Sequence, residues 1–574
     1  MNIIATKIRI EDDEEVDSQG LLLPNVAQPI KKRKSQRFLI IIITVFTIAS
    51  IFVTLTLLQT DNSKEQQPHL IVGTKGAVAV ETKECSDTGL QILKRGGSAV
   101  DAAIASALCI GVINSFATGN MHTKIGGFML IRSPNGTFEY IDFRETAPAA
   151  SYRDMFVKDP MAAQIGGLSV GVPGEIRGFE LAHQRHGKIP WKDLFTAAID
   201  IADKGFKVSD LLYSKLVKSK KWIEASPEFS RVFAPTGVIA QPGDIIKRPT
   251  LATTLRTIAN EGSNAFYEGK IAASIVNATQ ALGGILTLED MKSYQAKIRP
   301  TISTIYHSRK VVTTSGPTSG PALLSILNLI EPYYFNVTGP TPLTIHRFME
   351  ALKFGYAFRT EIADPDFVKN QVRLDEIISK AWADKTRENI TDDATHEYSY
   401  YHPKYDHHDS HGTMQLSVID EKNGAVALTS TVNLMFGAKF MDPVTGIILN
   451  DELDDFSIPG IPNSFGLYPS PYNYIEPYKR PLSTITPTII EDTETNELLV
   501  VGGSGGSQIM TATLNVILNT FDFNKNLFEA VQHPRIHHQL LPNVVQYETG
   551  FENDILNELV KKGHAVNIYI YTYI

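Results

Sequence analysis

Thr413 follows a glycine at the start of a segment with strand-like alternation, DSHGTMQLSV. A threonine hydroxyl needs a base to act as a nucleophile, and no GxSxG-type motif stands in a suitable context. The remaining base is the α-amino group of Thr413 itself, which exists only after a cut at Gly412–Thr413. The sequence therefore predicts self-cleavage there, while taken alone Gly412-Thr413 is also an ordinary turn and strand start.

A second group of residues suits the carboxylate of an amino acid. Arg144 lies in IDFRETAP, and its planar guanidinium can bind a carboxylate through two hydrogen bonds. The hydroxyls of Ser483 and Thr484, in PLSTITPT, are further donors. We therefore predict a carboxylate subsite from these three residues, with a structural salt bridge as the alternative for Arg144.

A third group suits an ammonium. Glu452 and Asp455 are three residues apart in NDELDDFS, so both carboxylates can point the same way on a turn, and Asn433 adds an amide oxygen. Alone, the acidic stretch would fit a solvated loop or a calcium loop. Beside Arg144, these residues instead predict a receptor for an amino-acid zwitterion, and Thr413 would attack an acyl group on its side chain.

The segment GGSGGSQIMTATLNVILNTF, residues 502–521, places small residues before an apolar helix. Backbone N–H groups at such a helix start bind anions. We expect the amides of Gly505 and Gly506 to stabilise a tetrahedral oxyanion, a contact that contributes roughly 3 to 4 kcal/mol per donor. The alternative is a flexible linker, although linkers seldom run directly into an apolar helix.

The elements that position these groups are also predicted. Two β-runs flank Asn423-Gly424, a strong hairpin signal, and folding there returns Thr431 and Asn433 beside Thr413. The apolar stretch SAVDAAIASALCIGVI predicts a buried helix. Helical and strand patterns alternate without a long linker, which favours one α/β domain.

These motifs resemble the γ-glutamyltranspeptidase (glutathione hydrolase) family of N-terminal-nucleophile hydrolases. The resemblance runs from about residue 69 to about 565 through ordered motifs that include GGSAVDAAIASALCIGV, DFRETAP, HGTMQLSV, PLSTITPTI and VVGGSGGSQI. It implies a four-layer αββα sandwich. It also implies γ-glutamyl transfer from glutathione and other γ-glutamyl donors to water or to amino-acid or dipeptide acceptors, without a cofactor or a metal.

The resemblance assigns roles to individual residues and divides the chain. The large subunit would be residues 69–412 and the small subunit 413–574, held together as a heterodimer. The implied roles are nucleophile for Thr413, support for Thr431, ammonium binding for Asn433, Glu452 and Asp455, carboxylate binding for Arg144, Ser483 and Thr484, and the oxyanion hole for Gly505 and Gly506.

Cys85 and Cys109 are the two cysteines of the chain. An oxidising compartment permits them to pair, and they match a disulfide of the animal enzymes; two buried free thiols are the alternative. Such a compartment also permits glycosylation at the Asn-x-Ser/Thr sequons, which are Asn135, Asn277, Asn336 and Asn389.

The first 68 residues predict a membrane anchor. Residues 38–58 contain no charged residue and match the thickness of a bilayer, and the basic cluster KKRK precedes them. We expect residues 1–37 to be a disordered cytosolic tail, 38–58 a transmembrane signal-anchor helix and 59–68 a stalk. The protein would then be a single-pass type II membrane protein with its catalytic domain outside the cell or in a lumen, at the plasma membrane or the vacuole.

Other functions are less well supported. A net charge of −8 gives no basic surface for nucleic acid. His402, His407, His408 and His411 lie close together in the sequence, but without cysteines or carboxylates at a defined ligand spacing they favour an exposed loop over a metal site.

Two alternatives concern the activity itself, a related self-processing amidase and a processing-dead binding or scaffold protein. Three departures from the family pattern bear on the second. HTKIGGFML has fewer glycines than the family's GIGGGGF, and Met414-Gln415 follows the nucleophile where a histidine is usual in the second place. The sequence stops at AVNIYIYTYI, before the further strand that the family normally carries.

Overall fold

The computed structural model describes residues 70–117, 126–406, 413–460, 462–492, 494–495 and 497–568. Residues 70–574 form one compact unit. Within the described part, no helix has the length and apolar character needed to cross a bilayer. The predicted span, residues 38–58, the tail and the stalk lie outside the described residues.

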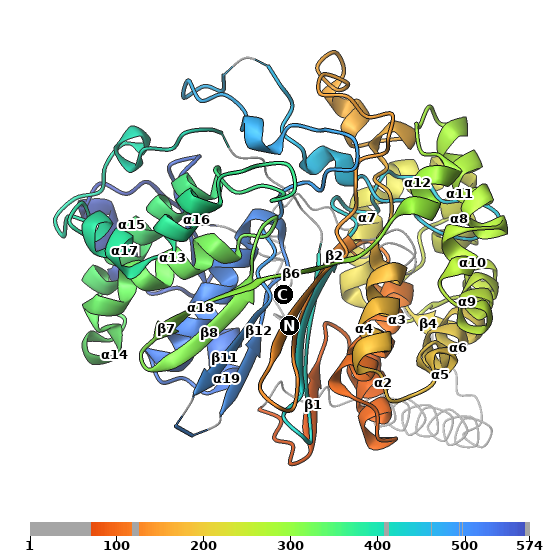
Figure 1. Ribbon diagram of the computed structural model, residues 1–574, viewed down its shortest axis with the longest axis horizontal. Helices are drawn as coiled ribbons and strands as arrows, with labels where there is room; N and C mark the ends of the chain where they lie inside the picture. The colour runs from red at the N-terminus through yellow and green to blue at the C-terminus, as the bar shows by residue number, and fades with distance from the viewer. Residues whose placement is uncertain are drawn as a thin grey trace, which may run out of the picture. The chain divides into compact units, whose positions relative to one another are not determined.

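Two β-sheets lie face to face at the centre of the unit, and helices cover the outer face of each (Figure 1). The first sheet has the order β1 (Gly76–Ala79), β9 (Met414–Asp420), β10 (Ala425–Thr431), β2 (Gly126–Arg132), β3 (Phe138–Asp142), β6 (Lys297–Arg299). The second has the order β12 (Leu498–Val501), β11 (Thr488–Asp492), β8 (Arg309–Thr314), β7 (Thr301–Tyr306). The chain therefore has the predicted αββα layers.

Side-chain alternation along the strands explains how each sheet is buried on both faces. On β2, Phe128 and Leu130 belong to the apolar cluster between the two sheets, whereas Met129 packs with the helices outside. On β8, Val312 faces the other sheet and Val311 faces the outer helices. Successive side chains of a strand point to opposite faces, so the doubly buried part of each strand carries apolar residues at consecutive positions, as in FMLI of β2 and VV of β8.

The outer helices form two separate apolar clusters with the sheets. Those on the first sheet are α2 (Lys83–Lys94), α3 (Ala99–Ile113), α4 (Glu175–His186), α5 (Trp191–Leu194), α6 (Thr196–Lys204), α7 (Asp210–Ala225), α8 (Pro227–Phe233), α9 (Pro249–Glu261), α10 (Asn264–Tyr267), α11 (Lys270–Ala281) and α12 (Leu288–Ser293). Those on the second are α13 (Gly320–Ile330), α14 (Phe335–Thr338), α15 (Pro342–Arg359), α16 (Gln371–Ile377), α17 (Lys380–Arg387), α18 (Ile509–Phe521), α19 (Leu527–Gln532) and α20 (Asn553–Lys561).

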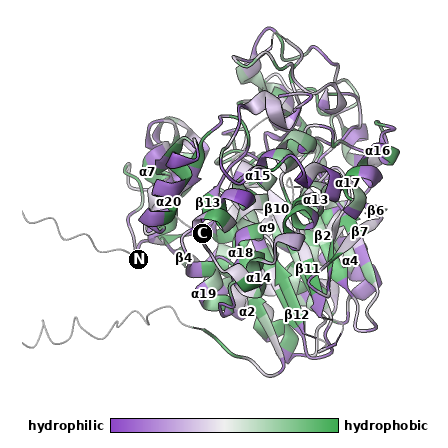
Figure 2. Ribbon diagram, turned by 90° about the vertical axis from the view of Figure 1, so that its left-hand side faces the viewer, coloured by the Kyte–Doolittle hydropathy of each residue, from purple (hydrophilic) through white to green (hydrophobic). Residues whose placement is uncertain are grey.

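Helix α3 is buried along its whole length, as its apolar sequence predicted. Figure 2 shows the contrast between such interior elements and the solvent side, since β11 and β12 are largely in the hydrophobic colour and α7 is mostly hydrophilic. Two small sheets complete the fold: β13 (Ile536–His537), β14 (Val545–Tyr547) and β15 (Val566–Ile568) in one, and β4 (Phe206–Lys207) with β5 (Ile245–Ile246) in the other.

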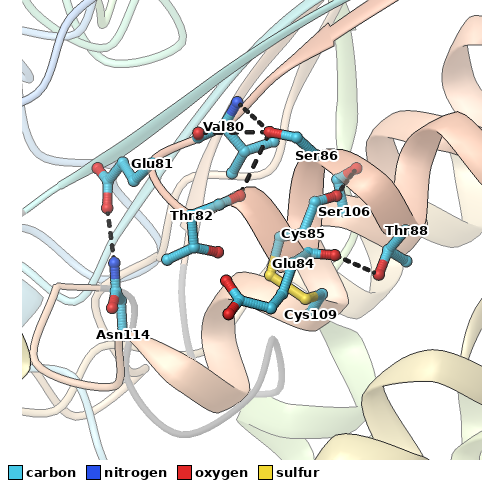
Figure 3. The surroundings of a disulfide bond; sticks show 10 residues. All are labelled: Val80, Glu81, Thr82, Glu84, Cys85, Ser86, Thr88, Ser106, Cys109 and Asn114. Atoms are coloured by element: carbon cyan, nitrogen blue, oxygen red, sulfur yellow. Dashed lines mark hydrogen bonds between the residues drawn. A yellow bond between two sulfur atoms is a disulfide. The ribbon is translucent and has the colours of Figure 1, made fainter. Parts of the chain in front are cut away.

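A disulfide joins Cys85 on α2 to Cys109 on α3, with 5.4 Å between the two Cα atoms (Figure 3). The Ser106 hydroxyl donates to the Cys85 carbonyl at 2.9 Å and adds a second link between the helices. The bond fixes the pair of helices that covers the outer face of β9. All four predicted sequon asparagines are exposed, and their glycosylation stays a prediction.

A buried polar cluster joins α15 to the segment after α20. His346 Nε2 lies 2.7 Å from the Thr391 carbonyl, and His346 Nδ1 lies 2.8 Å from His564 Nε2. His346, Glu350 and His564 are the one such group of metal-type ligands among the described residues. The ammonium of Lys353, 3.2 Å from Glu350 Oε1, already supplies a positive charge there, so we assign no metal to this cluster.

The buried His564 of this cluster makes the folding stability depend on pH. Burial lowers the pKa of His564 to about 2, and repulsion by the Lys353 ammonium lowers it in the same direction. The unfolded state then binds a proton near pH 6.5 that the folded state does not, so stability is full above pH 6.5 and falls below it, by about 1.4 kcal/mol per pH unit at most. His564→Asn should flatten the fall in melting temperature between pH 6.5 and 4.5. The exposed His402→Asn serves as control, and an equal slope in His564→Asn and the wild type would contradict this account.

Candidate active site

Thr413 lies immediately before β9 and is buried, with 7% of its surface exposed. Strands β9 and β10 form the predicted hairpin around Asn423, and Ser430 on β10 pairs with Met414. Asn423 has a φ of 60°, which asparagine tolerates better than most residues. The register therefore returns the end of β10 to the level of Thr413, as predicted.

The residues after β10 turn sharply into the site. The Asn433 N–H donates to the Thr431 hydroxyl at 2.9 Å, and Asn433 has a φ of 73°. Its amide Nδ2 donates to the Asp451 carbonyl at 3.2 Å and lies 3.4 Å from Asp454 Oδ2. Thr431 and Asn433 are thus fixed beside the acidic segment that the sequence placed around the ammonium.

Arg144 is fully buried just after β3 and forms ion pairs with both Glu452 and Asp455. Its two terminal nitrogens each take one carboxylate, because the one-turn 3₁₀ helix Glu452–Asp455 points both acids the same way. Asp455 is only 6% exposed, so the solvated-loop alternative is wrong. The buried salt bridge expected as the alternative for Arg144 is present, and it uses the two acids predicted for the ammonium.

Further acids that the sequence analysis did not select lie near Arg144 or near its neighbouring acids. They are Glu145, Glu175, Asp451 and Asp454, all buried. Burial raises the pKa of Glu145 to about 8, and burial also raises the pKa values of Glu452 and Asp451. Burial would lower the pKa of Arg144, but attraction by Glu452 and Asp455 raises it above its usual value. The site thus has more acids than cations and favours an added positive charge.

Ser483 and Thr484 follow the two carbonyls that hold Arg144. Arg144 donates to the Pro481 carbonyl through Nε and to the Leu482 carbonyl through Nη2, at 3.4 Å each. Both hydroxyl residues are buried, at 4% and 1% exposure. The Arg144 guanidinium therefore lies against the backbone that leads directly into Ser483 and Thr484.

The glycine-rich segment lies against β9, the strand that follows Thr413. A Cβ on Gly502 would be 2.4 Å from Gln415 Oε1, so a larger residue there would displace the Gln415 side chain. Gly505 and Gly506 have φ values of 113° and 65° and lead into α18, the helix expected after them. The flexible-linker alternative is wrong, because the segment is an ordered turn between β12 and α18.

The structure thus brings together the predicted nucleophile strand, the arginine with its two acids, the two hydroxyl residues and the glycine turn. Gly412 lies outside the described residues, as do His407, His408 and His411. The four additional acids were readable in part, since Glu145 follows Arg144 directly and Asp451 and Asp454 stand within the acidic motif.

The fold and the site are those of an N-terminal-nucleophile hydrolase. Two sheets lie between helix layers, a threonine stands just before a central strand, and the sheet ends at a buried cluster of charges. The fold is shared with a solved cephalosporin acylase from Bacillus halodurans, with a TM-score of 0.74 at 24% identity, covering 89% of this chain and 92% of that one. The chain belongs to the γ-glutamyltranspeptidase family, whose model, described as gamma-glutamyltranspeptidase, matches residues 85–572.

Individual relatives agree with this assignment. The chain is 44% identical over 513 residues to "Glutathione hydrolase proenzyme 1" of Schizosaccharomyces pombe, covering 88% of this chain and 81% of that protein. It is 38% identical to "Glutathione hydrolase proenzyme" of Escherichia coli, covering 87% of each. The solved γ-glutamyltranspeptidase of Helicobacter pylori matches with a TM-score of 0.55 at 30% identity, covering 58% of this chain and 96% of that one. The protein is therefore an enzyme of this family.

Proposed function

We propose that this enzyme transfers γ-glutamyl groups from glutathione and other γ-glutamyl donors to water or to amino-acid and dipeptide acceptors. The observation that carries the proposal is Arg144, buried between Glu452 and Asp455 and bonded to the carbonyls just before Ser483 and Thr484. One cation and two hydroxyls suit an α-carboxylate, and the surrounding acids suit an α-ammonium. The names of the relatives, glutathione hydrolases, support the same substrate class.

Maturation is the first step of the proposal. The Thr413 hydroxyl oxygen attacks the Gly412 carbonyl carbon, the Gly412–Thr413 C–N bond breaks, and the hydroxyl proton passes to the released α-amino group of Thr413. Water then hydrolyses the resulting Gly412 ester, which cuts the chain and restores the Thr413 hydroxyl. The S. pombe and E. coli relatives are both called proenzymes, which supports a processed form. The two pieces, residues up to 412 and residues 413–574, would stay together because β9 and β10 of the second lie between β1 and β2 of the first.

Turnover then uses the same hydroxyl. The Thr413 oxygen attacks the γ-carbonyl carbon of the donor while its proton passes to the α-amine. The Gly505 and Gly506 amides stabilise the oxyanion, the C–N bond breaks, and the proton moves to the departing amine. Water or an acceptor amine attacks the resulting γ-glutamyl ester, and Thr413 recovers its proton. Thr431, bonded to the Asn433 N–H, would support the nucleophile.

The first experiment asks whether the purified protein is one chain or two on a denaturing gel and whether it hydrolyses a γ-glutamyl anilide. Two chains with activity are expected. A single chain without activity would favour the processing-dead scaffold, and two chains that act only on other acyl amides would favour the related amidase.

Asp455 should decide which donors are accepted. Asp455→Asn removes the negative charge but keeps the shape, so donors with a free α-amino group should lose far more activity than their N-acetylated analogues. We expect about tenfold or more in kcat/KM for the free-amino donor, in line with the strength of a charged hydrogen bond. The measurement compares both anilides on wild type and variant. Equal losses on both would make Asp455 structural.

We also propose that residues 38–58 anchor the protein in the plasma membrane or the vacuolar membrane, with the catalytic domain on the outer or lumenal side. The uncharged span and the basic cluster before it support this. The full chain should remain in the membrane pellet after extraction with alkaline carbonate, and its release into the supernatant would contradict the anchor.

A further inference from the structure

Arg359 is the last residue of α15, and its side chain reaches the loop that carries Ser483 and Thr484. It is buried, with 4% of its surface exposed. Its Nη2 donates to the Thr484 hydroxyl oxygen at 2.7 Å, and its Nε donates to the Ser319 hydroxyl oxygen at 2.8 Å. One guanidinium therefore binds two hydroxyl groups from two different segments.

The second of these hydroxyls continues to the same loop. Ser319 Oγ donates its proton to the Ser483 carbonyl at 2.8 Å. The Ser483 N–H in turn donates to the Pro317 carbonyl at 2.8 Å. Arg359 is thus connected to the Thr484 side chain directly and to the Ser483 carbonyl through Ser319, so it restrains the loop at both residues.

The contact with Thr484 also sets the direction of its hydrogen bonds. A guanidinium has only donors, so the Thr484 oxygen must be the acceptor in this contact. The hydroxyl proton of Thr484 then remains for an acceptor elsewhere, and a carboxylate is the strongest acceptor available. A charged donor on the oxygen polarises the O–H bond and makes it a better donor.

We propose that Arg359 is a positioning residue for the α-carboxylate subsite, which acts by holding Thr484 as a hydrogen-bond donor and by fixing the 483–484 backbone. The inference rests on the proposed function, because it assumes that the carboxylate of a γ-glutamyl donor binds at Ser483 and Thr484. Arg359 is thus a second cation at the proposed carboxylate subsite, and it belongs neither to the PLSTITPT segment nor to the acidic cluster around Arg144.

The test is a double-mutant cycle on the processed enzyme with a γ-glutamyl anilide. Arg359→Lys keeps the charge but loses the fork that binds two hydroxyls at once, so KM should rise about tenfold while kcat changes little. Thr484→Val should raise KM by a similar factor. If Arg359 acts through Thr484, the double variant should be little worse than Thr484→Val alone.

Arg347→Lys is the matched control, because Arg347 lies on the same helix and also makes two bonds, to Asp392 at 2.7 and 2.6 Å. It should leave KM unchanged. Ser319→Ala removes only the connection from Arg359 through Ser319 to the Ser483 carbonyl, so it should raise KM to a smaller extent. This variant gives a result even if Arg359→Lys does not fold.

The outcomes separate the two claims. The positioning role would be overturned if the KM of the double variant rose by the product of the two single effects. It would also be overturned if the Arg359, Ser319 and Thr484 variants all lost kcat equally while KM stayed normal. Either result would leave the proposed function standing. A processed wild type without γ-glutamyl-anilide turnover would overturn the proposed function and this inference together.

Discussion

Thr413→Ala should yield a single unprocessed chain with no γ-glutamyl transfer activity. The substitution removes the hydroxyl that attacks the Gly412 carbonyl, and without the cut the α-amine that serves as base never forms. Thr413→Ser should still be processed, because the hydroxyl remains. A denaturing gel, N-terminal sequencing of the smaller piece and an anilide assay read all three properties.

The wild type should give a smaller piece whose first residues read Thr, Met and Gln. Thr304→Ala is a suitable control, because that hydroxyl bonds Asn328 at 2.7 Å in the other sheet and should not affect processing. An intact wild-type chain with full activity would rule the mechanism out. Cleavage of Thr413→Ala at the same bond would assign the cut to another protease.

Arg144→Lys is expected to weaken turnover of a γ-glutamyl anilide at low substrate by about 1 to 3 kcal/mol, the range for hydrogen bonds to charged groups. The guanidinium contacts Glu452 and Asp455 through separate nitrogens and the Pro481 carbonyl through a third. A lysine ammonium is a single point of charge and cannot keep all three contacts while also binding a carboxylate in two places.

The amount of processed protein must be measured first, because a buried arginine also stabilises the acids around it. Arg309→Lys, which alters a partly exposed ion pair with Asp492, is the control and should have normal kinetics. Unchanged kinetics in a normally processed Arg144→Lys enzyme would dismiss the carboxylate assignment.

Local signals predicted the elements around the site. The Asn423-Gly424 turn, the all-apolar α3 and the small residues before α18 each have a cause within a few neighbouring residues, and the structure contains all three elements. The spacing of Glu452 and Asp455 likewise predicted that both carboxylates point the same way.

Contacts between distant segments were not predictable in this way. Arg359 bonds Thr484 across 125 residues, and in the sequence it is only a cation at the end of an apolar helix. His346 and His564 are 218 residues apart and meet only because α15 packs on α20. A salt bridge was one alternative for Arg144, but its partners were not foreseen, because the sequence placed Glu452 and Asp455 at the opposite end of the substrate.

The disulfide has a consequence for how the proposed mature enzyme is held together. Cys85 and Cys109 both precede Thr413, so the one covalent cross-link of the described chain lies wholly within the larger piece. The pieces would be held by the ladders of β1 with β9, β10 with β2 and β8 with β11, by the ion pairs of Arg144, and by the apolar layers on either side of the sheets. Reductant would therefore have no bearing on whether they separate, and the smaller piece would leave only when both shared sheets unfold.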